Sequence, residues 1–243
     1  MAAIEINSLS KSFGETAALV DLTLTVEQGE LYGLLGPNGA GKTTTIDILT
    51  GQITPDAGDV RVLGIDPVTS PVAVRERVGI LPEKQSPPSL MTPREYLQFC
   101  GTVRNIPDDE VDRGIETWAD RLDFTGKLDT LSTDLSRGQQ QKVMIASAFL
   151  HEPDLVCIDE PLANLDPLVQ ERVKRIFRDY QADGKTILLS THNIDVAAEL
   201  CTRVGILNAG SCIAEVQPPD LAPDHTLLEE FVDRIEATVP SHA

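Results

Sequence analysis

Hydrophobic and polar positions follow two different periods along the chain, and each period predicts a type of element. Near the N-terminus, residues 4–6 and 22–26 alternate at every second position, which predicts two strands. Short apolar runs at 31–35, 78–81 and 155–158 predict further strands. The other expected strands span residues 59–63, 186–190, 203–207 and 211–215.

Apolar residues three and four positions apart predict helices between these strands. The expected helices span residues 43–49, 93–104, 108–122, 135–150, 167–180, 193–201 and 227–235. Strand–helix alternation after residue 155 indicates a mostly parallel sheet with helices on both faces. The predicted fold class is therefore α/β, with an N-terminal antiparallel β region and a helical insertion at about 84–150. We expect one domain over residues 1–217 and a short tail at 218–243.

A glycine-rich stretch follows the apolar run 31–35 and fits the pattern G-x-x-x-x-G-K-[ST] of P-loop NTPases. The candidate nucleotide-binding residues in it are Gly36, Pro37, Asn38, Gly39, Ala40, Gly41, Lys42, Thr43 and Thr44. Glycines let backbone N–H groups surround phosphate oxygens, and the helix N-terminus that follows favours negative charge. Lys42 is expected to reach the β- and γ-phosphates, and the Thr43 hydroxyl to bind Mg²⁺. The alternative is a glycine turn that binds nothing.

Two carboxylates, Asp159 and Glu160, end the apolar run 155–158. Ligands of open α/β sheets bind at the carboxyl ends of strands, so we expect both acids to meet the phosphates. Asp159 can hold Mg²⁺, and Glu160 can polarise a water for attack on the γ-phosphate. His192 follows the strand at 186–190 and is expected to contact the γ-phosphate in the same crevice. The alternatives are solvated acids and an ordinary polar histidine.

A second anion site is expected at residues 135–139, where a helix begins. Ser136 and Gly138 would stand at the N-terminus of this helix, where unpaired N–H groups attract anions. Taken by itself, the stretch is better explained by a plain capping serine. The spacing to Asp159 favours the anion site, because about twenty positions hold one helix of about 21 Å, a proline turn and a strand.

The net charge of −18, from 38 acidic and 20 basic residues, argues against a surface for nucleic acid or anionic lipid. Our hypothesis is adaptation to high salt, because the Debye length at molar salt is about 3 Å and self-repulsion is screened. Full ellipticity in dilute buffer would count against this hypothesis. The chain has no apolar run of about 18 residues and no signal-peptide pattern at its start, so we expect a cytoplasmic location.

Taken together, these stretches resemble the nucleotide-binding subunit of ABC transporters over about residues 4–215, because five elements occur in that family's order. Two of these elements are the phosphate loop and the Asp159-Glu160 pair. His192 resembles the family's switch histidine. Phe13 matches the aromatic residue that stacks on adenine, although a lone phenylalanine near a strand is more often a core residue. The remaining two are a signature made of Leu135, Ser136, Arg137, Gly138 and Gln139, and a D-loop made of Asn164, Leu165 and Asp166.

The resemblance implies an ATPase that uses ATP and Mg²⁺ and works as a head-to-tail dimer with a second nucleotide-binding subunit, either the same chain or a related one. It implies that Ser136 and Gly138 of one copy face Lys42 and Thr43 of the other, so that ATP closes the dimer and hydrolysis by Glu160 opens it. It also implies transmembrane permease subunits, one short helix of which docks beside the helical insertion. The chain would then lie peripherally on the cytoplasmic face of the cell membrane. No nucleic-acid partner is expected.

The sequence departs from the family at two places. Glu83 stands where the family often has glutamine; it can bind Mg²⁺ through oxygen but lacks the amide donor, and Gln85 could substitute only if the loop register shifts. Ala163-Asn164 replaces the usual Ser-Gly. The Leu81-Pro82-Glu83 form and the compact size resemble subunits of drug-efflux or polymer-export transporters, so export is favoured over import.

Three other functions compete with this interpretation. The first is a soluble relative that acts on ribosomes or DNA, but such proteins usually carry two domains, long coiled-coil insertions or cysteine clusters. A small-molecule kinase is disfavoured by Glu160 and the 135–139 signature. A nucleotide-binding scaffold without turnover is disfavoured because Lys42, Asp159 and His192 accompany Glu160.

Overall fold

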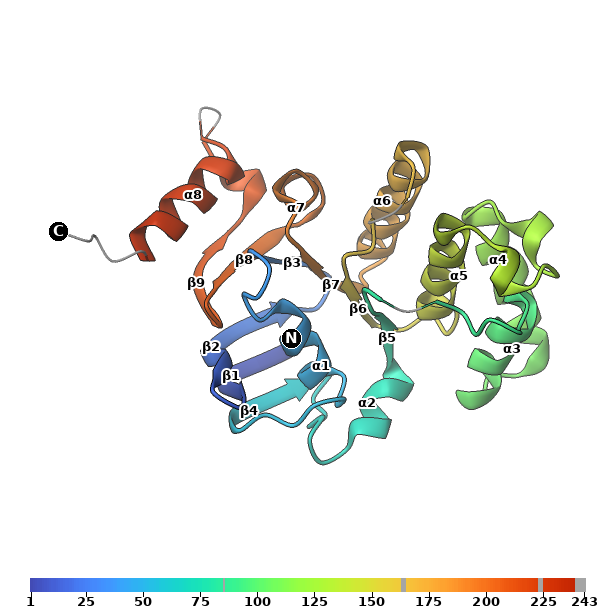
Figure 1. Cartoon of the computed structure of the whole chain (residues 1–243), viewed down its shortest axis with the longest axis horizontal. Coiled ribbons are helices and arrows are strands. Elements are labelled where there is room, and N and C mark those ends of the chain that lie inside the picture. Colours follow the sequence, from blue (N-terminus) through green and yellow to red (C-terminus); the bar gives the residue numbers. More distant parts are fainter. Residues whose placement is uncertain (85, 163–164, 223–224, 239–243) are drawn as a thin grey trace.

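The larger of two sheets has six strands in the order β5-β6-β7-β3-β8-β9 (Figure 1). The computed structural model describes all residues except 85, 163–164, 223–224 and 239–243. Neighbouring strands are parallel throughout, except for the β8–β9 pair. The strands are β3 (Leu31–Leu35), β5 (Val78–Leu81), β6 (Leu155–Asp159), β7 (Thr186–Thr191), β8 (Arg203–Asn208) and β9 (Ser211–Val216). The predicted mostly parallel sheet is confirmed.

A separate antiparallel sheet, in the order β2-β1-β4, forms the N-terminal β region. It contains β1 (Ala2–Phe13), β2 (Thr16–Glu27) and β4 (Ala57–Val62). β1 and β2 are much longer than the alternating segments predicted, because their pairing has register shifts. Ser8 and Asp21 adopt positive φ angles of 49° and 50° at two of these shifts. Each bulge changes which face the next side chain occupies, so a period-two search loses the strand there.

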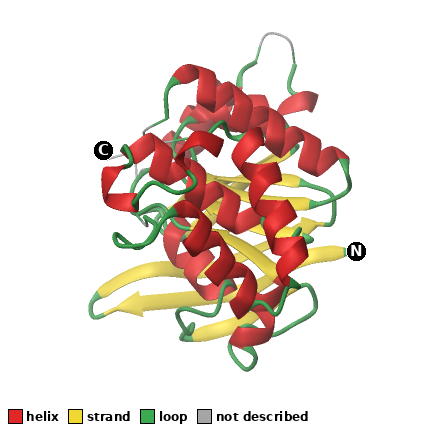
Figure 2. Cartoon of the chain, turned by 90° about the vertical axis from the view of Figure 1, so that its right-hand side faces the viewer, coloured by secondary structure: helices red, strands yellow, loops and turns green. Residues whose placement is uncertain are grey.

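Helices cover both faces of the larger sheet, as predicted. They are α1 (Lys42–Leu49), α2 (Pro71–Arg77), α3 (Pro93–Val103), α4 (Asp108–Arg121), α5 (Arg137–Phe149), α6 (Pro167–Ala182), α7 (Ile194–Leu200) and α8 (Leu227–Thr238). α1 lies between the two sheets, whereas α5, α6 and α7 pack on the opposite face (Figure 1). Figure 2, seen from the side of α3 to α5, shows helices in front of the strands. In the described part of the chain, no helix is both long and apolar enough to cross a membrane.

The prediction missed α2. This seven-residue helix buries one side chain, that of Val74, so it has no apolar stripe to detect. The helix expected at 135–150 begins at Arg137, because Ser136 is its N-cap residue.

The core has two parts, one on each face of the larger sheet. Successive residues of β6 divide between them: Leu155 and Cys157 face the N-terminal sheet and α1, and Val156 and Ile158 face the helices. All four side chains have no exposed surface. Burial on both faces explains why β6 is a continuous apolar run rather than an alternating one.

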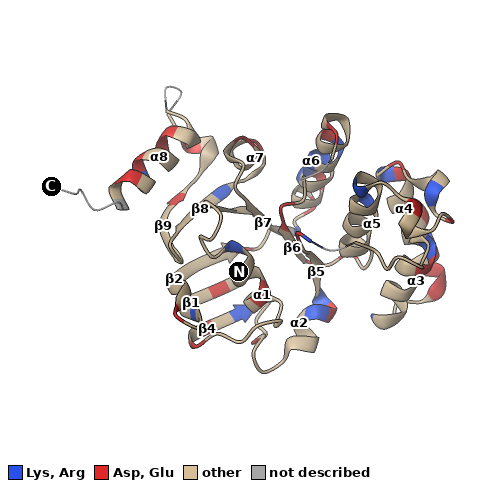
Figure 3. Cartoon of the chain, in the orientation of Figure 1, with Lys and Arg blue, Asp and Glu red and all other residues tan. Residues whose placement is uncertain are grey.

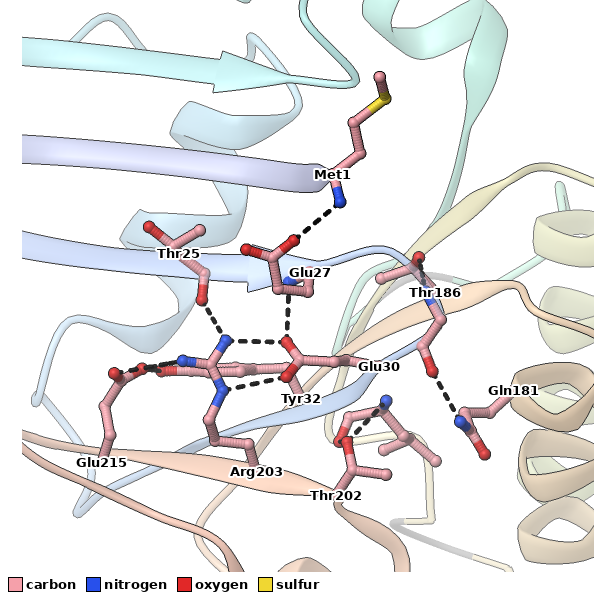
Figure 4. Close-up of polar contacts among 12 residues, drawn as sticks. Met1, Thr25, Glu27, Glu30, Tyr32, Gln181, Thr186, Thr202, Arg203 and Glu215 are labelled. Atoms are coloured by element: carbon pink, nitrogen blue, oxygen red, sulfur yellow. Dashed lines mark hydrogen bonds and ion pairs between the residues drawn. The ribbon is translucent and has the colours of Figure 1, made fainter.

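A polar cluster around Arg203 joins β2, β3, β8 and β9 (Figure 4). Arg203 forms two bonds with Glu30, at 2.8 and 3.1 Å, and donates to Glu215 at 3.2 Å and to the Thr25 carbonyl at 2.6 Å. The Tyr32 hydroxyl also donates to Glu215, at 2.5 Å, and the Arg203 guanidinium lies 4.9 Å from the Tyr32 ring centroid. Burial, followed by the charge of Glu215, raises the pKa of Tyr32 well above its usual value. The cluster therefore connects β3, the strand that leads into the phosphate loop, to β2 of the N-terminal sheet and to β8 and β9 of its own sheet.

Candidate functional site

The phosphate loop connects the end of β3 to the start of α1, as predicted. Glycine is required at both ends of the loop. A Cβ atom on Gly36 would lie 2.4 Å from the Leu207 carbonyl oxygen, and one on Gly41 would lie 2.6 Å from the Leu19 side chain. Gly41 also has φ of 105°, in the region that glycine adopts without strain. The loop therefore passes against β8 and β2 with no room for side chains at these positions.

Lys42, the first residue of α1, turns back over the loop. Its ammonium group donates to the carbonyl oxygens of Gly36 at 2.8 Å and Pro37 at 3.2 Å, and the residue is 7% exposed. Burial lowers the pKa of Lys42, whereas the negative charges of Glu160 and Asp159 oppose that change. Burial and the neighbouring carboxylates therefore act in opposite directions on the charge of this ammonium group.

Thr43 and Asp159, 116 positions apart in sequence, meet at the edge of the sheet. The Thr43 hydroxyl donates to Asp159 Oδ2 at 2.7 Å, and Asp159 is 2% exposed. Both groups offer hard oxygen atoms of the kind that Mg²⁺ prefers, and Mg²⁺ is usually held by one or two carboxylates together with substrate phosphates. Among the described residues, no group of three or more His, Cys, Asp or Glu side chains could hold a metal by itself. A cation bound here would take its other ligands from phosphate or water.

Glu160 and His192 form a second pair beside the first. The Glu160 carboxylate accepts a hydrogen bond from the His192 backbone N–H at 2.8 Å and from the Thr191 hydroxyl at 3.2 Å. His192 Nδ1 lies 2.6 Å from the same carboxylate, and because an ionised carboxylate can only accept, Nδ1 carries the proton. The Glu160 backbone has φ of 48°, a conformation uncommon for residues other than glycine. The Glu160 side chain is 15% exposed and that of His192 is 60% exposed.

These groups line one cavity of about 600 Å³. The carboxyl ends of β3, β5, β6 and β7 supply the phosphate loop, Glu83, the Asp159–Glu160 pair and His192, and β1 supplies Phe13. Phe13 is 50% exposed, so it is not a core residue. Four residues that the sequence did not indicate also line the cavity: Thr16, Ala17, Ala18 and Lys84. These four residues belong to no motif. Only their closeness in sequence to Phe13 or Glu83 could have indicated that they line the cavity.

The signature residues do not line this cavity. Ser136 and Gln139 form a capping box at the start of α5: the Ser136 hydroxyl accepts from the Gln139 N–H at 3.3 Å, and the Gln139 side chain accepts from the Ser136 N–H at 2.9 Å. In the D-loop, Asp166 caps α6 by accepting from the Val169 N–H at 3.1 Å, and Leu165 is buried. Asn164 and Gln85 lie outside the described residues.

Comparison with known proteins gives concordant matches. A family profile described as "ABC transporter" matches residues 19–163. "Nod factor export ATP-binding protein I" of Rhizobium meliloti (strain 1021) is 35% identical over 230 residues, which cover 95% of this chain and 67% of that protein. The protein of the same name from Burkholderia lata is 35% identical over 246 residues, covering 100% of this chain and 79% of its own length.

Solved structures agree. One described as "Structure of ATP binding subunit of ABC transporter" superposes with a TM-score of 0.90 at 30% identity, covering 96% of this chain and 99% of that chain. A dimeric ATP-binding cassette bound to ADP and Pi has a TM-score of 0.81 at 24% identity, covering 88% of this chain and 98% of that one, and shares the fold.

Proposed function

Because this chain belongs to the ABC transporter family as an ATP-binding subunit, we propose that it drives the export of a substrate through a membrane permease by hydrolysing ATP in the cavity described above. The observation that carries the proposal is the meeting of two pairs in that cavity. Thr43 lies 2.7 Å from Asp159, and Glu160 lies 2.6 Å from His192. The function of the relatives, named for Nod factor export, supports export over import. Nothing in the comparisons supports an action on ribosomes or nucleic acid.

The triphosphate of ATP would lie against the loop, where the α1 N-terminus and the Lys42 ammonium oppose its charge. Thr43 and Asp159 are the residues that would hold Mg²⁺, with Glu83 as a further oxygen donor on the cavity wall. When bound, Mg²⁺ would neutralise charge on the phosphate oxygens.

Glu160 would orient and deprotonate the attacking water. Its carboxylate is fixed by three donors from residues 191 and 192, so its direction is set before substrate binds. With Nδ1 bound to Glu160, the Nε2 atom of His192 is the nitrogen left to contact the γ-phosphate. Positioning and charge supply most of the catalysis in phosphoryl transfer, and this arrangement offers both.

A second copy would complete the site from the signature. In the described part of the chain, the backbone N–H groups of Arg137 and Gly138 make no hydrogen bond, because they occupy the first two positions of α5. Two free donors at a helix N-terminus suit a γ-phosphate held by the partner copy's phosphate loop. The absence of the signature from the cavity of its own chain supports this head-to-tail arrangement.

The permease would dock in a groove between the sheet core and the helical insertion. This cavity of about 350 Å³ is lined by Arg75 and Pro82 on one side and by Tyr96 and Arg104 on the other. Beside it, α3 exposes 54% of Phe99 and 59% of Val103. In Figure 3 the basic end of α2 stands out on a chain rich in acidic residues.

The chemistry of the groove favours a short helix that carries apolar side chains and a carboxylate. Arg75 and Arg104 both line the groove, so an acidic side chain of the partner would meet positive charge there. The groove and the nucleotide cavity share a segment of backbone, because Pro82 lines the groove and the next residue, Glu83, lines the nucleotide cavity. A movement of this segment would therefore change both sites.

The test is Glu160→Gln in the full chain. Gln preserves the shape, because its carbonyl oxygen can accept both His192 bonds while its amide donates to the Thr191 hydroxyl. We expect ATP binding to be retained and phosphate release to fall by roughly 10²–10⁴-fold. The matched control is Glu236→Gln, an exposed change on α8 that should leave turnover intact.

Undiminished phosphate release from the Glu160→Gln variant would remove Glu160 from the mechanism. The transporter assignment is tested separately, by purifying the tagged chain from solubilised native membranes. A polytopic membrane protein should co-purify; recovery with ribosomes instead would contradict the proposal.

A further inference from the structure

An ion pair outside the nucleotide cavity connects the segment after α1 to the outer end of β1. Asp56 lies in the turn between α1 and β4, and its carboxylate receives one donor on each oxygen. Oδ1 accepts from the Lys11 ammonium at 2.8 Å, and Oδ2 accepts from the Ser12 backbone N–H at 2.7 Å. The Asp56 N–H in turn donates to the Ser10 carbonyl at 2.9 Å. Three contacts thus fix residues 10–12 of β1.

The same lysine contacts Phe13. The Lys11 ammonium lies 5.6 Å from the centroid of the Phe13 ring, within the range of a cation–π interaction. Lys11 is held in place, since its side chain is 16% exposed in spite of its length. Phe13 is the last residue of β1, is half exposed, and lines the nucleotide cavity together with Thr16 and Ala17 of the facing strand. Phe13 itself is paired with Thr16, the first residue of the facing strand, so the contacts of Asp56 with Lys11 and Ser12 add to the support of this hairpin end.

We propose that Asp56 is a positioning residue for the base of ATP: through Lys11 and Ser12 it holds the Phe13 ring as a fixed platform on which adenine stacks. The inference rests on the proposed function, specifically on stacking at Phe13. One carboxylate would thus connect the segment between α1 and β4 with the end of β1 that carries Phe13. A platform fixed before binding loses less freedom when the base stacks on it.

The chemistry of the contact requires a carboxylate. Both Asp56 oxygens accept hydrogen bonds, so an asparagine would direct its NH₂ group at either the Lys11 ammonium or the Ser12 N–H. Asp56→Asn therefore breaks one of the two bonds with almost no change in shape. Asp59→Asn is the matched control, because the Asp59 carboxylate is exposed on β4 and makes no hydrogen bond in the described part of the chain.

The experiment measures the dissociation constants of two probes, Mg²⁺–ATP and base-free Mg²⁺–tripolyphosphate, by direct titration of the full chain. Stacking of one base is worth enough that Phe13→Ala should weaken ATP binding by about fivefold or more. We expect Asp56→Asn to weaken ATP binding by about threefold, because the ring remains but is no longer fixed. Tripolyphosphate affinity should stay unchanged in both variants, and Asp59→Asn should change the affinity for neither probe. In the Phe13→Ala background, Asp56→Asn should have no further effect.

Several results would overturn the inference. Equal losses for ATP and tripolyphosphate would make Asp56 a general structural residue. So would an Asp56→Asn effect that persists in the Phe13→Ala background. If Phe13→Ala weakens ATP binding and neither Asp56→Asn nor Lys11→Met does, the platform exists but Asp56 does not position it. If Phe13→Ala itself leaves ATP affinity unchanged, the stacking proposal fails first. Lys11→Met replaces Asp56→Asn as the test variant if the latter does not fold.

Discussion

The substitution Arg203→Met tests whether the polar cluster of Figure 4 stabilises the fold. Methionine keeps the packing over the Tyr32 ring and removes the guanidinium, which leaves Glu30 and Glu215 without their cation. Arg203 is 18% exposed and Glu30 is 22% exposed, so water replaces little of what is lost at that pair. The Glu215 side chain is 38% exposed, so water screens its interaction with Arg203 and we leave that interaction out of the stability estimate. Breaking a partly buried, bidentate pair of this kind costs about 3 kcal/mol.

Each kcal/mol shifts the melting temperature of a chain of this size by about 2–4 °C, so Arg203→Met should lower it by roughly 6–12 °C. The assay is thermal unfolding followed by circular dichroism, at one fixed potassium chloride concentration. Arg113→Met is the control, because its pair with Asp109 is exposed by 72% and 79% and should be worth less than about 1 kcal/mol. A shift of about 2 °C corresponds to at most about 1 kcal/mol. If both variants melt within about 2 °C of the wild type, the cluster contributes no more to stability than an exposed ion pair, and the reasoning is wrong.

Two further predictions concern an arginine in the groove and a buried histidine. Arg104→Glu should abolish co-purification of the permease while leaving the ATPase rate of the isolated chain unchanged, and Arg113→Glu should leave both co-purification and the ATPase rate unchanged; retained co-purification with Arg104→Glu would place the docking site elsewhere. Burial, aided by the charge of Arg104, lowers the pKa of His151 to about 4. The unfolded chain therefore binds more protons below about pH 6.5, so the free energy of unfolding should fall as pH drops from 6.5 towards 4. His151→Gln should flatten this part of the denaturation profile, and identical profiles would refute the assignment.

The larger sheet and the meeting of the candidate site residues at its edge were predictable because each follows from a local pattern. β3, β5 and β6 are short apolar runs with a turn or a charged residue at the end, and their bounds were predicted to within one residue. Of the candidate site residues, Lys42 ends the loop that follows β3, Asp159 is the last residue of β6, and His192 follows β7. Parallel strands deliver their carboxyl ends to one edge, so the sequence order of these residues fixes which of them meet.

Contacts between segments that carry no motif could not be predicted in this way. The ion pair between Lys11 and Asp56 spans 45 positions, and its geometry depends on how β4 pairs with the bulged strand β1. A bulge moves every later side chain to the other face, so neither the length of β1 nor the direction of Phe13 could be derived from alternation. For the same reason Thr16, Ala17 and Ala18, on the facing strand, gave no signal before the hairpin was seen.

The signature at residues 135–139 shows which part of a residue's position the sequence predicts and which part depends on tertiary packing. A helix of 13 residues is about 20 Å long and a strand of five about 17 Å, so α5 followed by β6 returns the chain to the level at which it started. The position of Ser136 along the strand axis is therefore predictable from sequence. It places Ser136 level with the edge of the sheet that holds Asp159. The sideways offset between the helical layer and the sheet is set by tertiary packing, and it keeps Ser136 out of the cavity that Asp159 lines. If the free N–H groups at the start of α5 bind an anion, as proposed above, they lie at the correct level but outside the cavity of their own chain, and this is why the proposal takes the ligand from a second copy.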